Sequence, residues 1–261
     1  MKYKIVDTVI DVNLPLDLET TWEPFITDSD TTDIKTNIML FSKDCYGVDQ
    51  LDISGMVHSL KNGSTVLFAD KDWKNARIYG NDSFEISSLI ELQLYSYLLI
   101  NDTLLFHSSI VDYKGNGIMF LGPSGIGKTT QAELWNKYMG AEILNGDLVF
   151  VKSNKDGFYG YGSPWHGSSP YYENKKVKIK ALVILEQAKE NKVRKLEGFE
   201  TLNSLMKQLF LPIWDESKRD VSLKTLDKLI KEETVYYLKC RPDKEAVERV
   251  YSIEEIVKGD K

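Results

Sequence analysis

Short apolar runs separated by polar turns dominate the first 85 residues. Apolar and polar residues alternate over 3–12, which is typical of a strand with one buried face. Two more apolar runs, 37–41 and 65–68, are bounded by polar turn residues such as those at 61–64. The region 1–85 is therefore expected to be β-rich.

The hydrophobic period changes after this region. Leucines at helical spacing predict a helix over 87–100, and a strand is expected at 104–112. A fully apolar strand over 118–121 follows a glycine-containing turn. A helix is expected over 128–139, and Gly140 would end it, because glycine adopts the left-handed conformation of a helix C-terminus.

The remaining pattern mixes strands and helices. Strands are expected at 141–144, 148–151, 158–161, 177–185 and 235–238, and helices at 199–210, 222–232 and 243–250. These patterns predict an α/β (α+β) fold in two parts. A β-rich N-terminal region, 1–85, would precede a domain at 86–261 with a mixed sheet and flanking helices.

Composition and charge exclude several classes of protein. The net charge is −6, so no overall basic field is present to hold a nucleic acid. The two cysteines, Cys45 and Cys240, form no CxxC pattern, which fits a reducing compartment. No apolar run approaches the roughly 20 residues that cross a bilayer. A cytoplasmic protein without a membrane partner is expected.

One contiguous motif carries specific chemistry. It matches the pattern G-x-x-x-x-G-K-[ST] and consists of Gly122, Pro123, Ser124, Gly125, Ile126, Gly127, Lys128 and Thr129. The glycines let successive backbone N–H groups face phosphate oxygens, and the following helix adds its positive end. Lys128 would pair with the β- and γ-phosphates, and Thr129 would offer its hydroxyl to magnesium. The motif, with Thr130 after it, predicts binding of a nucleoside triphosphate, expected to be ATP, with Mg²⁺.

The residues around this loop extend the pattern. A histidine, a strand, a Gly-x-Gly turn and a second strand lead into it. The residues of this arrangement are His107, Gly115, Gly117, Ser124, Gly125, Gly127, Lys128 and Thr129. Over roughly 105–151, and less clearly to about 190, this arrangement resembles the bacterial HPr serine kinase/phosphorylase family. The resemblance implies a kinase core related to ATP-dependent phosphoenolpyruvate carboxykinase. Small homologues of this kind accompany peptide natural-product pathways and phosphorylate precursor peptides.

One position departs from the family pattern. The family carries a pair of carboxylates after the next strand, and the matching positions here are Gly146 and Asp147. The family's first carboxylate resembles a general base for the target serine, so the standard mechanism lacks its base here. Asp147 would hold magnesium, or would belong to a hairpin turn at Asn145-Gly146. His107 would orient a phosphate or serve as the base instead.

Further candidates lie beyond the loop. Glu186 ends an apolar strand and would ligate magnesium or position a nucleophile, or would be a surface residue. The loop 162–172, with Trp165 and His166, would form a substrate lid or pack structurally. Arg241 would reach a phosphate from the end of a strand.

The sequence therefore predicts an enzyme, a kinase that transfers the γ-phosphoryl of ATP to a hydroxyl. Serine on a small protein or precursor peptide is the expected acceptor. The predicted catalytic residues are His107, Lys128 and Asp147, and the predicted magnesium ligands are Thr129, Asp147 and Glu186. A small-molecule or carboxykinase-like phosphotransferase and a non-catalytic ATP sensor remain alternatives. A homo-oligomer is expected from the resemblance alone, because the family often forms rings.

Overall fold

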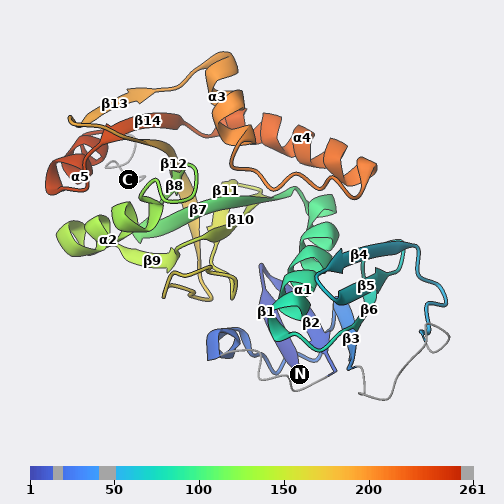
Figure 1. Ribbon diagram of the computed structural model, residues 1–261. Coiled ribbons are helices and arrows are strands. Elements are labelled where there is room, and N and C mark those ends of the chain that lie inside the picture. Colours follow the sequence, from blue (N-terminus) through green and yellow to red (C-terminus); the bar gives the residue numbers. More distant parts are fainter. Residues whose placement is uncertain (14–19, 41–50, 254–261) are drawn as a thin grey trace. The chain divides into compact units, whose positions relative to one another are not determined.

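The computed structural model describes residues 1–13, 20–40 and 51–253, and divides the chain into two compact units, Met1–Ile100 and Asn101–Lys261 (Figure 1). Cys45 lies outside the described residues. The division falls after the first long helix, whereas the sequence pattern placed the boundary before it.

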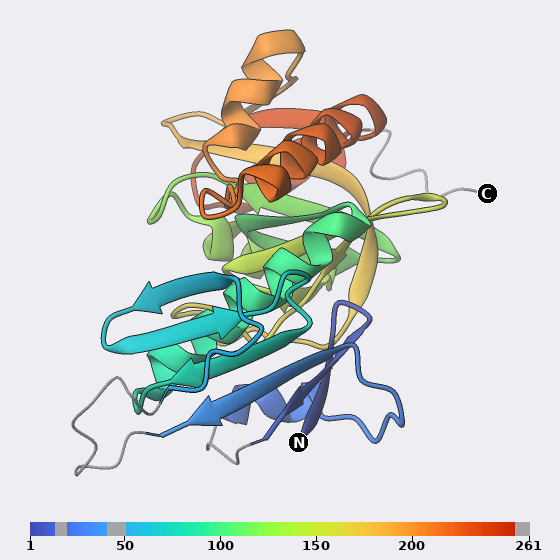
Figure 2. The same cartoon turned by 90° about the vertical axis from the view of Figure 1, so that its right-hand side faces the viewer.

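The first unit is built on a mixed six-stranded sheet in the order β1-β2-β3-β6-β5-β4. Its strands are β1 (Lys2–Ile5), β2 (Thr8–Val12), β3 (Ile34–Met39), β4 (His58–Asn62), β5 (Thr65–Ala69) and β6 (Asn75–Tyr79). The antiparallel β4–β5 hairpin is visible as two cyan arrows in Figure 2. Its helices are η1 (Thr20–Phe25), α1 (Ser83–Leu98) and most of η3 (Leu99–Asn101). The predicted β-rich character of this region is confirmed.

Helix α1 belongs to the first unit because its polar groups bind that unit's strands. Asp82 caps the helix by accepting a hydrogen bond from the backbone N–H of Glu85. The Glu85 carboxylate in turn accepts a hydrogen bond from the Thr65 hydroxyl at 2.7 Å. Further along the helix, the fully buried Gln93 accepts one from the Thr36 hydroxyl at 2.6 Å. These contacts place the boundary after α1.

The second unit holds an eight-stranded mixed sheet in the order β11-β10-β7-β8-β12-β14-β13, with β9 paired to β7. Its strands are β7 (Thr103–Tyr113), β8 (Asn116–Leu121), β9 (Glu142–Asn145), β10 (Leu148–Asn154), β11 (Gly157–Tyr161), β12 (Lys176–Gln187), β13 (Lys192–Lys195) and β14 (Val235–Cys240). Its helices are α2 (Lys128–Met139), α3 (Gly198–Met206), α4 (Glu216–Glu232) and α5 (Lys244–Tyr251).

Helices cover both faces of this sheet (Figure 1). On β8, Ile118 and Phe120 pack with α2 and α5 residues, whereas Met119 and Leu121 belong to the core beneath α3 and α4. This alternation follows from the pleat of a strand buried on both faces. The predicted helix over 128–139 is confirmed, and Gly140 ends it with a φ of 68°. No helix in the described part of the chain has the length and apolarity to span a membrane.

Candidate nucleotide-binding site

The phosphate-loop motif lies at one edge of the second unit's sheet. Strand β8 ends at Leu121, and the parallel strands β12 and β14 end at the same edge. In sheets of this kind, ligands bind beyond the carboxyl ends of the parallel strands. Gly125 and Gly127 have φ values of 77° and 109°, in the left-handed region that favours glycine.

The start of α2 fits an anion. Its N-cap is Gly127, which has no side chain to accept hydrogen bonds from the first backbone N–H groups of the helix. The first backbone N–H groups of a helix lack partners within the helix, so they are suited to phosphate oxygens. At Gly125, a Cβ would have no atom within 4 Å, so the tip of the loop is open.

Lys128 is positioned inside this site. It is only 6% exposed, its Nζ donates a hydrogen bond to the Gly122 carbonyl oxygen at 3.2 Å, and the same Nζ lies 3.1 Å from His107 Nε2. Burial lowers the pKa of Lys128, while the charge of Asp147 acts in the opposite direction. The ammonium group therefore stands where charged phosphates would relieve its desolvation.

An interruption in the sheet brings Asp147 to His107. Strands β9 and β10 both pair antiparallel with β7, in the registers Ile110↔Asn145 and His107↔Leu148. The break between them holds Gly146 and Asp147, and the Asp147 carbonyl oxygen accepts a hydrogen bond from the Ser108 N–H at 2.8 Å. The alternative of a hairpin turn here is wrong, because β9 and β10 are partners of β7.

A single histidine nitrogen joins the predicted catalytic residues. His107 Nε2 lies 2.9 Å from Asp147 Oδ1 and 3.1 Å from Lys128 Nζ. A ring nitrogen either carries a proton or offers a lone pair. It can therefore donate to Asp147 or accept from Lys128, but it cannot do both at once. His107, Lys128 and Asp147 thus form one contiguous cluster.

Two predicted magnesium ligands also lie together. The Thr129 hydroxyl donates to the Gly146 carbonyl oxygen at 3.0 Å. Thr129 therefore contacts the residue that directly precedes Asp147. Mg²⁺ in phosphoryl-transfer sites takes one or two protein oxygens and completes its shell with water and phosphate. Among the described residues, no group of three or more histidine, cysteine or acidic side chains forms a metal site. The Thr129 hydroxyl and the Asp147 carboxylate are nevertheless suitable ligands for Mg²⁺.

The third predicted ligand, Glu186, makes different contacts. Its carboxylate lies 3.1 Å from Lys239 Nζ and accepts a hydrogen bond from the Tyr237 hydroxyl. The next residue, Gln187, contacts the loop instead: its amide donates to the carbonyl oxygens of Gly125 and Ile126, each at 3.3 Å. Side chains of successive strand residues point to opposite faces of a sheet, so Glu186 and Gln187 contact different residues. Magnesium ligation by Glu186 stays a prediction.

A buried asparagine organises the site, although the sequence pattern indicates it only as part of a turn. Asn145 Oδ1 accepts hydrogen bonds from the N–H groups of Asp147 and Leu148 at 2.8 and 2.9 Å. Its Nδ2 donates to the carbonyl oxygens of Ser163 and Trp165 at 3.0 and 3.1 Å. Asn145 thereby ties the loop 162–172 to the backbone that presents Asp147.

That loop also explains the glycine at position 146. A Cβ on Gly146 would lie 1.9 Å from Ser169 Oγ and 2.5 Å from Ser169 Cβ. Across the same loop, a Cβ on Gly167 would lie 2.4 Å from Asp147 Oδ2. The loop therefore leaves no room for a side chain at position 146.

Adding this missing side-chain atom should destabilise the second unit. We expect Gly146→Ala to lower the free energy of unfolding by about 1–3 kcal/mol, because the new methyl group overpacks against Ser169. Denaturant unfolding of Gly146→Ala, Ser169→Gly and the double variant would measure the coupling. Ser169→Gly should restore much of the lost stability in the double variant. Equal stability of Gly146→Ala and the unaltered chain would contradict the steric explanation.

Comparisons with known proteins give little beyond this geometry. No protein-family model and no curated protein matches the sequence. Among solved structures, the HPr(Ser) kinase/phosphatase from Coxiella burnetii is similar, with a TM-score of 0.34 and 8% identity. The match covers 56% of this chain and 90% of that one. A likeness of this degree identifies neither a family nor an activity.

Proposed function

We propose that this chain is an ATP-dependent kinase that transfers the γ-phosphoryl group to a hydroxyl, with serine on a small protein or peptide as the acceptor. The observation that carries the proposal is the cluster at the uncapped start of α2. There Lys128 Nζ and Asp147 Oδ1 lie 3.1 and 2.9 Å from His107 Nε2. The sequence resemblance to HPr serine kinases supports the same reaction.

Each residue of the cluster has a distinct role in the proposal. The loop amides and Lys128 hold the phosphates, because phosphoryl transfer is catalysed mainly by positioning and by neutralising charge. Thr129 and Asp147 hold magnesium, which supplies positive charge to the phosphate oxygens. Bound phosphates would attract the Lys128 ammonium group away from His107. His107 Nε2 would then contact Asp147 alone.

His107 then accepts the acceptor's proton. The hydroxyl O–H bond breaks as its oxygen bonds to the γ-phosphorus, and the bond from that phosphorus to the bridging oxygen of ADP breaks. The proton passes to the other ring nitrogen, His107 Nδ1, while Nε2–H donates to the Asp147 carboxylate, which stabilises the resulting imidazolium. This assignment supplies a base at a site where glycine occupies position 146.

The test is transfer of label from γ-labelled Mg·ATP to serine-containing acidic and neutral peptides. Label in phosphoserine is the expected result, and peptides with alanine in place of serine are the control. Absence of transfer to any peptide or protein acceptor, by a preparation that binds ATP, would overturn the kinase assignment.

A non-catalytic ATP sensor is the second candidate. The specific observation in its favour is Ser169 Oγ, which would lie 1.9 Å from a Cβ at position 146 and so fills the place of the family's carboxylate. A sensor would bind Mg·ATP and release no ADP, with or without acceptors. Turnover measured by ADP release therefore separates the two functions.

A further inference from the structure

A short segment after α3 lies beside the phosphate loop, on the edge of β7. Strand β8 pairs with β7 only over 108–113 and ends at Leu121, where the phosphate loop begins. Strand β10 occupies the opposite edge of β7, so residues 208–210 lie on the same edge as β8. There the Gln208 carbonyl oxygen accepts a hydrogen bond from the His107 N–H at 2.9 Å. This segment therefore brings a further residue, Gln208, next to the proposed base.

The register of the segment sets the direction of the Gln208 side chain. Phe106 and Leu209 are partners in an antiparallel bridge, so Gln208 stands opposite His107. Phe106 and Leu209 belong to the core beneath α3 and α4. Because side chains alternate along a strand, His107 and Gln208 project from the other face, which α2 covers. Residues opposite each other in antiparallel strands have Cβ atoms about 5 Å apart, so the two side chains are direct neighbours.

The Gln208 side chain is nearly buried and has no partner. Gln208 is 8% exposed, and its amide forms no hydrogen bond with any described residue. Both amide atoms nevertheless keep accessible surface, unlike the enclosed and unpaired Gln131 Oε1. A largely buried polar group without a partner costs free energy, and a bound molecule can supply the missing bonds. An open, unpaired amide beside His107 is therefore suited to contact a substrate.

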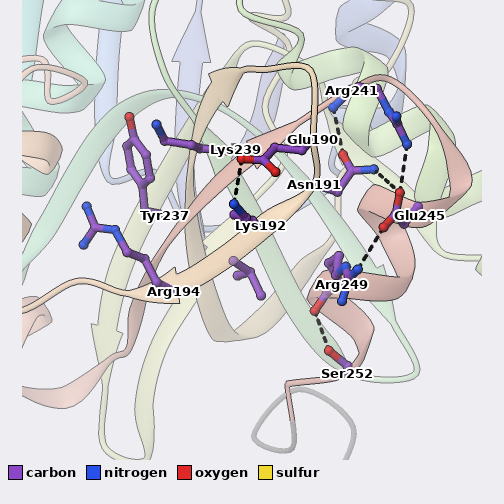
Figure 3. Close-up of a pocket in the computed structure, with 11 residues that line it drawn as sticks. Glu190, Asn191, Lys192, Arg194, Tyr237, Lys239, Arg241, Glu245, Arg249 and Ser252 are labelled. Carbon is purple, nitrogen blue, oxygen red and sulfur yellow. Dashed lines mark hydrogen bonds and ion pairs between the residues drawn. The ribbon is translucent and has the colours of Figure 1, made fainter.

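The pocket drawn in Figure 3 differs in this respect. It has a volume of about 650 Å³ and is lined by residues of β13, β14 and α5 and by the chain next to them. Arg241, the cation expected to reach a phosphate, lines this pocket and pairs with Asp243 at 2.7 Å and with Glu245 at 2.8 Å. Arg249 pairs with Glu245 as well, at 2.9 Å. These side chains satisfy one another, whereas the Gln208 amide has no such partner.

We propose that Gln208 binds the peptide group beside the acceptor serine and so holds the serine hydroxyl at His107. This role rests on the proposed kinase function and deepens it, because it favours a peptide over a small molecule as the acceptor. A primary amide carries N–H donors and an acceptor oxygen, and a peptide group offers one of each, so the two can pair twice. Phosphate oxygens mainly accept hydrogen bonds and would leave Gln208 Oε1 unpaired. Asp147 contacts His107 from the β10 edge, which leaves the Gln208 edge for the acceptor.

Steady-state kinetics of Gln208→Met in the full chain tests this role, with Mg·ATP and the serine-containing peptides of the labelling experiment. Methionine keeps the length of the side chain but cannot pair with a peptide group. KM for the peptide should rise about tenfold, because two hydrogen bonds to the acceptor are lost. The turnover number and the affinity for Mg·ATP should stay within about twofold, as expected for a contact made equally before and during transfer.

Denaturant unfolding of the same variant separates this role from a structural one. Gln208→Met should unfold at the same denaturant concentration as the unaltered chain, or at a higher one, because the amide has no partner to lose. Asn203→Leu is the matched control, since Asn203 is an exposed amide on α3. It should leave KM and kcat unchanged.

Three results would overturn the role of Gln208. An unchanged KM in Gln208→Met, or an equal rise in Asn203→Leu, would do so while the kinase assignment stands. Tenfold weaker binding of Mg·ATP by Gln208→Met would place Gln208 at the nucleotide instead of the acceptor. Absence of transfer by an unaltered chain that binds ATP would refute the proposed kinase function itself, and the role of Gln208 with it.

Discussion

Replacing Lys128 by alanine should weaken Mg·ATP binding by about a hundredfold. Lys128 is 6% exposed and its ammonium group bonds to the loop at the Gly122 carbonyl oxygen, so phosphates would meet it with little intervening water. Hydrogen bonds to charged groups contribute about 1.5–3 kcal/mol, and about 1.4 kcal/mol corresponds to a factor of ten in affinity. The loss of several such bonds to phosphate oxygens gives the expected factor.

Isothermal titration calorimetry would measure this effect. Lys137→Ala is the matched control, because Lys137 lies on the exposed side of the same helix, with its Nζ 5.1 Å from the Tyr138 ring centroid. It should bind ATP normally. An unchanged dissociation constant in a folded Lys128→Ala variant would remove the basis for a nucleotide site at this loop.

The second large effect is expected for Asp147→Asn, which should slow phosphoryl transfer by roughly 10²–10⁴-fold. The amide keeps the volume of the side chain, which matters because Gly167 packs closely against Asp147. It cannot carry the negative charge that stabilises a protonated His107 or holds magnesium. The loss should therefore appear mainly in kcat.

Steady-state kinetics with the best peptide acceptor would separate kcat from KM. Asp156→Asn, in the exposed turn between β10 and β11, is the control and should retain the full rate. A rate for Asp147→Asn within a few-fold of that of the unaltered chain would show that Asp147 has no part in the chemistry.

The elements that were predicted well have strong local patterns. The helix over 128–139 combines a glycine-rich start with a glycine stop, and both features lie within the segment itself. The strand expected over 3–12 is in fact two, because Val6 and Asp7 adopt left-handed φ values of 53° and 60°. The alternation is interrupted there, by Ile5-Val6 and then Asp7-Thr8, but neither pair contains the glycine or proline that usually indicates a turn. Strand β13 was missed because Lys192–Lys195 contains a single apolar residue.

The candidate site likewise has a part that local sequence predicts and a part that it does not. The phosphate loop is contiguous, so its spacing alone predicts its place between β8 and α2. His107 and Asp147 are 40 residues apart in number, and their contact depends on the register of β7 with β10, which no local pattern encodes. The contact of Gln187 with the phosphate loop was not predicted, because a neutral amide belongs to no motif. That contact arises only because β12 ends beside the loop.

The interrupted strand formed by β9 and β10 restricts how this chain can change in length. Both halves are aligned against β7, so deleting one residue between Asn145 and Leu148 would shift one half by a single position. Such a shift turns every side chain of that half to the opposite face of the sheet. Insertions are better tolerated at the exposed hairpin between Asn154 and Gly157. Among homologues, the number of residues in the break should therefore vary less than their identity.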